Sequence, residues 1–186
     1  SKLKQADLKQ ADLGGAKLKK ADLTRAKLKK ANLKSANLKD AKLIRADLTD
    51  AELNNAELEN ANLRNSKLKK AKLNDAKLKG ANLTSAKLEK ADLSNASLNK
   101  AKLRKADLTK ANLKNAVLKR AILDKADLAE ANLANASLNS AKLKKADLRK
   151  AYLKNASLKR AVLTDANLSG ANLRNTNLFK ADLKFS

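Results

Sequence analysis

Residues 101–120 read AKLRK, ADLTK, ANLKN and AVLKR, four five-residue units that each place alanine first and leucine third. The same unit repeats along all 186 residues, giving 37 units with Ser186 left over. Leucine holds the third place in every unit and alanine the first place in 34, the exceptions being Ser1, Ser66 and Thr176. High charge and low hydropathy would otherwise suggest disorder, but an apolar position in every unit indicates a folded core.

The period of five excludes a helix, although alanine, leucine and lysine all favour helices. At about 100° per residue, successive leucines would lie roughly 140° apart and would form no single apolar stripe. In an extended segment, the first and third residues point to the same side and the second points to the opposite side. The fourth and fifth residues are then free to turn a corner. Each unit therefore predicts one side of a β-solenoid.

Asparagine at the fifth position predicts how many sides the solenoid has. It occurs there eight times, and six of the eight fall at multiples of 20 residues from one another: Asn55, Asn95, Asn115, Asn135, Asn155 and Asn175, with Asp75 filling the gap. Both residue types suit a corner because they tolerate a positive φ, and stacked amides can form hydrogen-bonded ladders. We expect one domain over residues 1–186 with four units per coil and about nine coils, on the order of 45 Å long.

The units carry a family resemblance. Residues 6–10 read ADLKQ and residues 36–40 read ANLKD, a small residue, Asp or Asn, Leu and two polar residues. This pattern resembles the pentapeptide repeat family over the whole chain, and the resemblance implies an all-β, right-handed quadrilateral β-helix. Some natural members resemble DNA in shape and charge and protect topoisomerases. Those mimics depend on an acidic surface, so the opposite charge of this chain argues against that role.

The composition excludes several kinds of chemistry. The chain has no Cys, His, Met, Trp or Pro, so it lacks disulfides, thiol nucleophiles and the usual metal ligands and general base. A catalytic carboxylate pair would need a desolvated cleft, which a convex rod does not supply. We expect no enzyme activity, no cofactor and no metal. Neither a signal peptide nor an apolar run of about 20 residues is found, which is consistent with cytoplasmic expression and no membrane contact.

The net charge of +24 is spread unevenly over the four predicted sides. The sides that begin at Ser1, Ala6, Ala11 and Ala16 carry +10, +4, +1 and +9. The first and fourth sides meet at a corner, which predicts a groove-free basic edge that contacts nucleic acid or another polyanion without reading sequence. The cations expected there are Lys102, Arg104, Lys105, Lys119, Arg120, Lys142, Lys144, Lys145, Lys159 and Arg160.

Other features favour a surface that only keeps the protein soluble. Lysines outnumber arginines by 35 to 8, so few cations offer a bidentate fork. Aromatic side chains for base stacking are nearly absent. Acidic and basic residues also alternate at intervals of 20, as at Asp7, Lys27, Asp47 and Lys67, which predicts stabilising cross-strand pairs. We therefore place a structural scaffold, designed or consensus-derived given its regularity, ahead of a polyanion-binding module.

The ends of the solenoid are the remaining candidate site. An end coil exposes its core layer and unpaired backbone groups, so solenoids usually need caps. Phe179 and Phe185 have two alternative roles: they cover the last leucine layer, or they form an interface with a second copy. The second alternative predicts a homodimer or an end-to-end assembly.

Overall fold

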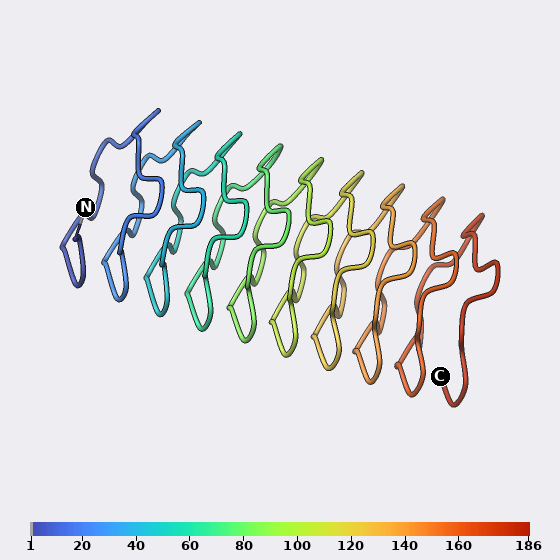
Figure 1. Ribbon diagram of the computed structural model, residues 1–186. Helices are drawn as coiled ribbons and strands as arrows, with labels where there is room; N and C mark the ends of the chain where they lie inside the picture. Colours follow the sequence, from blue (N-terminus) through green and yellow to red (C-terminus); the bar gives the residue numbers. More distant parts are fainter. Residues whose placement is uncertain (1) are drawn as a thin grey trace.

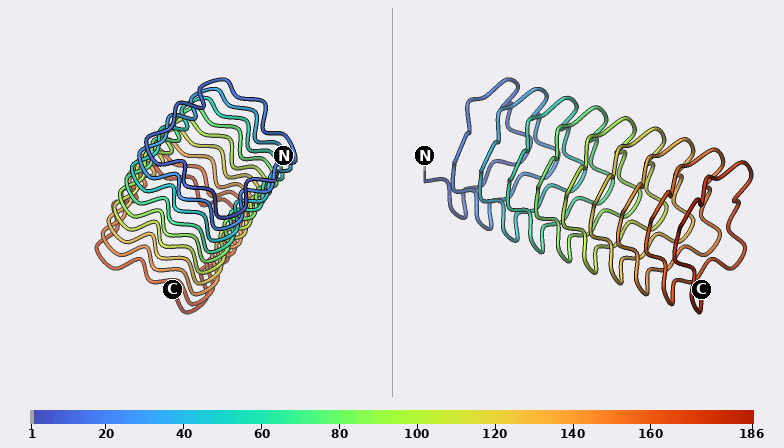
Figure 2. Two further views of the ribbon diagram at one scale, coloured as in Figure 1. Left: turned by 90° about the vertical axis from the view of Figure 1, so that its left-hand side faces the viewer. Right: turned by 45° about the vertical axis from the view of Figure 1, so that its right-hand side comes forward.

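The computed structural model describes residues 2–186. Its chain winds into coils stacked along one axis, with the N-terminus at one end of the rod and the C-terminus at the other (Figures 1 and 2). Parallel bridges join residues 20 apart, as in the series Lys102, Ile122 and Lys142. Four five-residue units therefore complete one coil, as the spacing of the corner asparagines predicted.

Within residues 2–186 there is no helix and no strand longer than one bridged residue. The bridges run from Lys2–Asp22 to Val162–Asp182 and involve the second residue of each unit. Around this residue the Leu103 N–H donates to the Ile122 carbonyl (2.7 Å), and the Ile122 N–H donates to the Ala101 carbonyl (2.9 Å). Each extended stretch is short because a two-residue corner follows the first three residues of every unit. The coils are held together by these backbone hydrogen bonds, which repeat from unit to unit.

The corners require a backbone conformation that most residues disfavour. At one of them the Ala106 N–H donates to the Leu103 carbonyl (3.0 Å), and Lys105, the third residue of the turn, has a φ of 56°. Every fifth residue from Gln5 to Phe185 has a positive φ. This turn favours Gly or Asn at its third residue, and other residues there cost roughly 1–2 kcal/mol. Stacking of the coils, rather than local preference, therefore imposes the corner on lysine and arginine.

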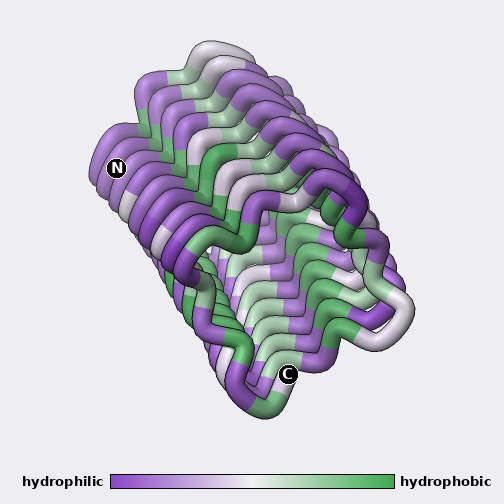
Figure 3. The backbone as a smooth tube through the Cα atoms, turned by 90° about the vertical axis from the view of Figure 1, so that its right-hand side faces the viewer, coloured by the Kyte–Doolittle hydropathy of each residue, from purple (hydrophilic) through white to green (hydrophobic). Residues whose placement is uncertain are grey.

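The first and third residues of the units form the core, as predicted. Between Ala21 and Ala166 none of them is more than 2% exposed. Figure 3 shows hydrophobic and hydrophilic residues recurring at the same place in each coil, so that like residues form stripes along the rod. The substituted core residues are satisfied, because the Ser66 hydroxyl donates to the Leu63 carbonyl (2.6 Å) and the Thr176 hydroxyl donates to the Leu153 carbonyl (2.8 Å). Ser1 lies outside the described residues.

The asparagine ladder forms over four coils. The side-chain amides of Asn115, Asn135 and Asn155 each donate to the asparagine one coil earlier, at 3.1, 3.2 and 3.2 Å. These bonds lie on the outer surface, and they tie neighbouring corners of the third side together.

The predicted charge ladder on the second side is incomplete. Asp7 pairs with Lys27 at 3.8 Å, whereas Asp47 accepts hydrogen bonds from the backbone N–H and the hydroxyl of Thr49 (3.1 and 2.6 Å). A short aspartate side chain reaches the backbone two residues on more easily than a lysine on the next coil.

The part of the chain that the structure describes contains no helix with the length and apolar character that a membrane span requires.

Candidate functional site

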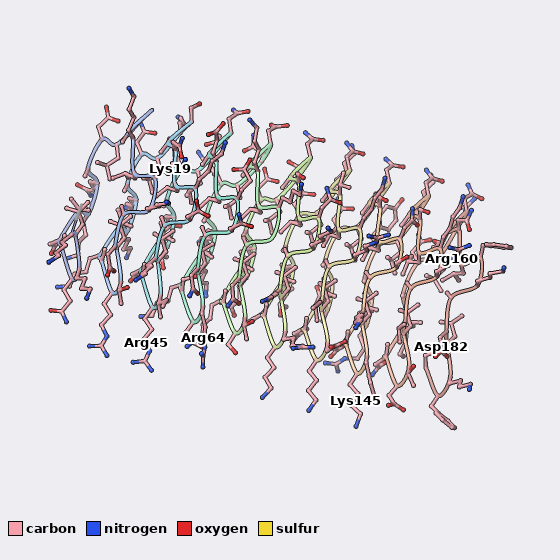
Figure 4. All side chains as sticks on the ribbon, in the orientation of Figure 1. Lys19, Arg45, Arg64, Lys145, Arg160 and Asp182 are labelled. Carbon is pink, nitrogen blue, oxygen red and sulfur yellow. The ribbon has the colours of Figure 1, made fainter. Side chains whose placement is uncertain are left out.

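The structure divides the ten predicted cations between two corners. We call the units beginning at residues 1, 21, 41 and onward to 181 the first side, and their fourth and fifth residues the first corner. The fourth corner is formed in the same way by the units beginning at residues 16, 36 and onward to 176. Lys145 and Arg160 mark these two corners, and Figure 4 shows them on different edges of the rod.

All ten side chains are exposed. The first corner carries Arg104, Lys105, Lys144 and Lys145, the fourth corner carries Lys119, Arg120, Lys159 and Arg160, and Lys102 and Lys142 lie on the first side between them. The predicted single edge is therefore two rows of cations that flank the first side. The reason is that a full side of the coil separates one corner from the next.

The sequence predicted a groove-free edge, but the first corner is hollowed between the side chains of successive coils. One hollow of about 450 Å³ is lined by Arg104, Lys105, Asp124, Lys125, Lys144 and Lys145. Within it Asp124 lies 3.4 Å from the Arg104 Nε and accepts a hydrogen bond from the Lys144 backbone N–H (3.3 Å). One carboxylate thus reduces the positive charge of this hollow.

A larger hollow of about 630 Å³ lies on the same side nearer the N-terminus. Its basic lining residues are Lys4, Arg25, Lys42, Arg45 and Arg64, and we call it the arginine hollow. Figure 4 shows Arg45 and Arg64 next to each other on the edge where Lys145 lies further along. None of these five residues is among the ten predicted cations. Counting arginines by corner would have found three of the five, because the first corner holds four of the eight arginines in the chain and three of them line this hollow.

The ion pairs of the described residues lie mostly on other sides of the rod. On the third side, Glu52 lies between Lys34 (2.6 Å) and Lys72 (2.8 Å). Hydrogen bonds from these two lysines lower the pKa of Glu52 to about 2. On the fourth side, Glu57 contacts Lys39 and Lys77 at 3.2 Å each, and the two hydrogen bonds lower its pKa as well. These carboxylates are ionised at neutral pH and are poor general acids.

The first side has only two ion-paired cations within residues 2–186, Lys4 with Asp22 (3.5 Å) and Arg104 with Asp124. Its other cations face solvent without a carboxylate partner. The pKa of Asp22 is lowered, first by its hydrogen bond from Thr24 and further by Lys4. The chemistry available on this side is therefore attraction of anions. No group of three or more acidic side chains that could hold a metal ion occurs in the described part of the chain.

The aromatic residues near the C-terminus are largely exposed. Phe179 is 60% exposed and Phe185 is 88% exposed. The Lys180 ammonium lies 5.3 Å from the Phe179 ring centroid, and Phe185 lines a hollow of about 490 Å³ together with Leu168. The two roles considered for these rings, cap and interface, both stay predictions.

Comparison with known proteins identifies what the chain is similar to. Residues 1–78 match the family described as pentapeptide repeat region, and residues 76–115, 111–149 and 146–184 match pentapeptide repeats. Among solved structures, HetL, a pentapeptide repeat protein involved in heterocyst differentiation regulation from the cyanobacterium Nostoc sp. strain PCC 7120, is 37% identical, with 100% of this chain and 86% of that chain covered and a TM-score of 0.56.

A second solved structure shares the fold alone. QnrB1, a plasmid-mediated fluoroquinolone resistance protein, is 18% identical, with 89% of this chain and 86% of that chain covered and a TM-score of 0.54. A search among curated proteins found no significant match.

Proposed function

Because the chain belongs to the pentapeptide repeat family, whose known fold is the right-handed quadrilateral β-helix, we propose that it serves as a rigid, non-catalytic scaffold of about nine coils. The observation that carries this proposal is the unbroken core between Ala21 and Ala166, none of whose first and third residues exceeds 2% exposure. Such a rod holds its surface residues at fixed spacing. The regularity of the repeat also favours a designed or consensus-derived origin.

A coil duplication tests the scaffold proposal. A second copy of residues 101–120 inserted after residue 120 keeps every downstream unit on its own side. It should lengthen the rod by about 4.8 Å without lowering the melting temperature, since each coil contacts only its neighbours. Small-angle X-ray scattering gives the length and circular dichroism the stability. A three-residue insertion at the same place is the control, and it should destabilise the rod because it breaks the five-residue register. An unfolded duplication variant would contradict the proposal.

The second candidate function is a basic module that contacts nucleic acid or another polyanion without sequence preference. It is favoured by the ten predicted cations, nine of which make no ion pair within the described residues. A mobility-shift titration with duplex DNA over a salt series tests it, against a variant with these ten cations replaced by glutamine. Micromolar binding that survives about 150 mM salt supports the module, and loss of binding by that salt leaves only the scaffold.

A further inference from the structure

We propose that the arginine hollow binds a linear phosphate chain, such as inorganic polyphosphate, laid along the axis of the rod. This inference rests on the second candidate function and assigns it a place and a ligand class. The hollow extends over successive coils of the first side, from Lys4 in the first coil to Asn82 in the fifth. A site built on stacked coils is elongated by construction, so it suits a chain of charges better than a single ion.

The cations of the hollow follow the axis. Lys4, Arg25, Arg45 and Arg64 belong to four successive coils of the first side. Since coils are spaced by about 4.8 Å, the row presents roughly one cation per step over about 14 Å. Guanidinium groups form two parallel hydrogen bonds with phosphate oxygens, whereas an ammonium group acts as a point charge. A row with three arginines therefore favours phosphate oxyanions.

The guanidinium groups have no competing partner in the structure. Arg25, Arg45 and Arg64 are exposed, and none makes an ion pair within residues 2–186. The carboxylate in this hollow, Asp22, lies in the second of its five coils, in the same unit as Arg25, and contacts Lys4 at 3.5 Å. By contrast, Asp124 in the smaller hollow lies between two cationic residues and contacts the Arg104 guanidinium. The third, fourth and fifth coils of the arginine hollow, which include Arg45 and Arg64, therefore contribute no acidic side chain to its lining.

Two amides supply neutral donors beside the guanidinium groups. The Asn62 side-chain oxygen accepts the Arg64 backbone N–H (3.2 Å), and the Asn82 oxygen accepts the Thr84 backbone N–H (3.1 Å). With their oxygens engaged, both side chains leave their NH₂ groups without an acceptor in the described part of the chain. Amide N–H groups of this kind can bind phosphate oxygens that the arginines do not reach.

The lining favours a bare phosphate chain over single-stranded nucleic acid. Proteins that hold single strands combine a basic groove with aromatic side chains on which bases stack. The residues that line the arginine hollow include no aromatic side chain, and Ile44 is its one large apolar residue. Charge and hydrogen-bond donors are present while a surface for bases is absent, so polyphosphate fits better than single-stranded DNA.

The test uses the full chain, linear polyphosphate of about 15 units and single-stranded oligothymidylate of similar charge, with affinities measured by calorimetry at about 150 mM salt. The test variant combines Arg25→Gln, Arg45→Gln and Arg64→Gln. Glutamine is compatible with the fifth position of Arg25 and Arg45, because Gln5 and Gln10 already adopt a φ of 57° there, and Arg64 is a fourth residue that needs no positive φ. The variant's melting temperature, measured by circular dichroism, checks that the fold is kept.

The matched control combines Lys30→Gln, Lys70→Gln and Arg174→Gln, none of which belongs to the ten predicted cations. It removes the same charge from two fifth positions and one fourth position outside the hollow. We expect polyphosphate affinity to fall at least about tenfold in the test variant and less than about threefold in the control. A further variant with lysine in place of Arg25, Arg45 and Arg64 keeps the positive charge but loses the guanidinium groups that can form two parallel hydrogen bonds. It should bind polyphosphate about threefold more weakly than the unmodified chain.

Each outcome decides the proposal. Equal losses in the test and control variants would overturn the arginine hollow as the site while leaving a polyanion-binding module in place. Tighter binding of oligothymidylate than of polyphosphate would overturn the ligand class. Unchanged binding by the lysine variant would overturn the role of the guanidinium fork. If the unmodified chain binds neither probe, both the inference and the second candidate function fail together.

Discussion

Replacing Leu103 with alanine should show how much one buried leucine of the central core contributes to the free energy of unfolding of the rod. Leu103 is 1% exposed, and the change removes three carbon atoms worth about 0.8 kcal/mol each on transfer from water, or about 2.4 kcal/mol. The Leu103 N–H donates to the Ile122 carbonyl (2.7 Å), and the Leu103 carbonyl accepts the Ala106 N–H (3.0 Å). These backbone hydrogen bonds keep the coil from closing the cavity that the shorter alanine side chain leaves. The full loss should therefore be about 3–5 kcal/mol, a large part of the 5–15 kcal/mol typical of a folded domain.

Urea denaturation followed by far-UV circular dichroism measures this loss through the shift in midpoint at constant slope. The matched control is Leu178→Ala, since Leu178 holds the same position in its unit but is only partly buried. That change should cost about 1–2 kcal/mol. Equal losses for the two leucines would refute the argument that burial and fixed backbone set the cost. A lower slope for Leu103→Ala would show that the two halves of the rod unfold separately.

Three other changes test separate parts of the structure. The pKa of Glu52 is lowered from 4.5 to about 2 in the fold. The ionised carboxylate therefore stabilises the folded state fully above pH 4.5, and this stabilisation is lost as pH falls towards 2. The difference in urea midpoint between the unmodified chain and the Glu52→Gln variant should become smaller over that pH range. Gly80→Ala should cost about 1 kcal/mol or more, measured by thermal melting, because Gly80 has a φ of 70° and a Cβ would lie 2.5 Å from the Asn60 Oδ1. Ala106→Ser should cost less than about 1 kcal/mol, measured by urea denaturation. The reason is that Ser66, also the first residue of its unit, is buried and its hydroxyl donates to the Leu63 carbonyl three residues back (2.6 Å).

The repeat predicts most of the fold because its core residues are local in sequence and strict in period. Leu103 and Ala106 can be assigned to the interior from spacing alone, and both are buried. The interval of 20 between Asn115 and Asn135 predicts the stacking of their amides, which is observed at 3.2 Å. Surface ion pairs are less predictable: Asp47 stacks on a lysine in the bridge register, yet its carboxylate bonds to Thr49.

The five-residue period by itself determined which residues are buried and where the chain turns, and the spacing of the corner asparagines determined that coils stack at intervals of 20. The physical reason is that a side of three extended residues and a corner of two leaves one way to bury both alanine and leucine in every unit. Only the tertiary structure decided how the cations group. It separated the predicted basic edge into two corners and placed Arg45 beside Arg64 in a hollow, because side-chain reach and the direction of each corner depend on the coil in three dimensions.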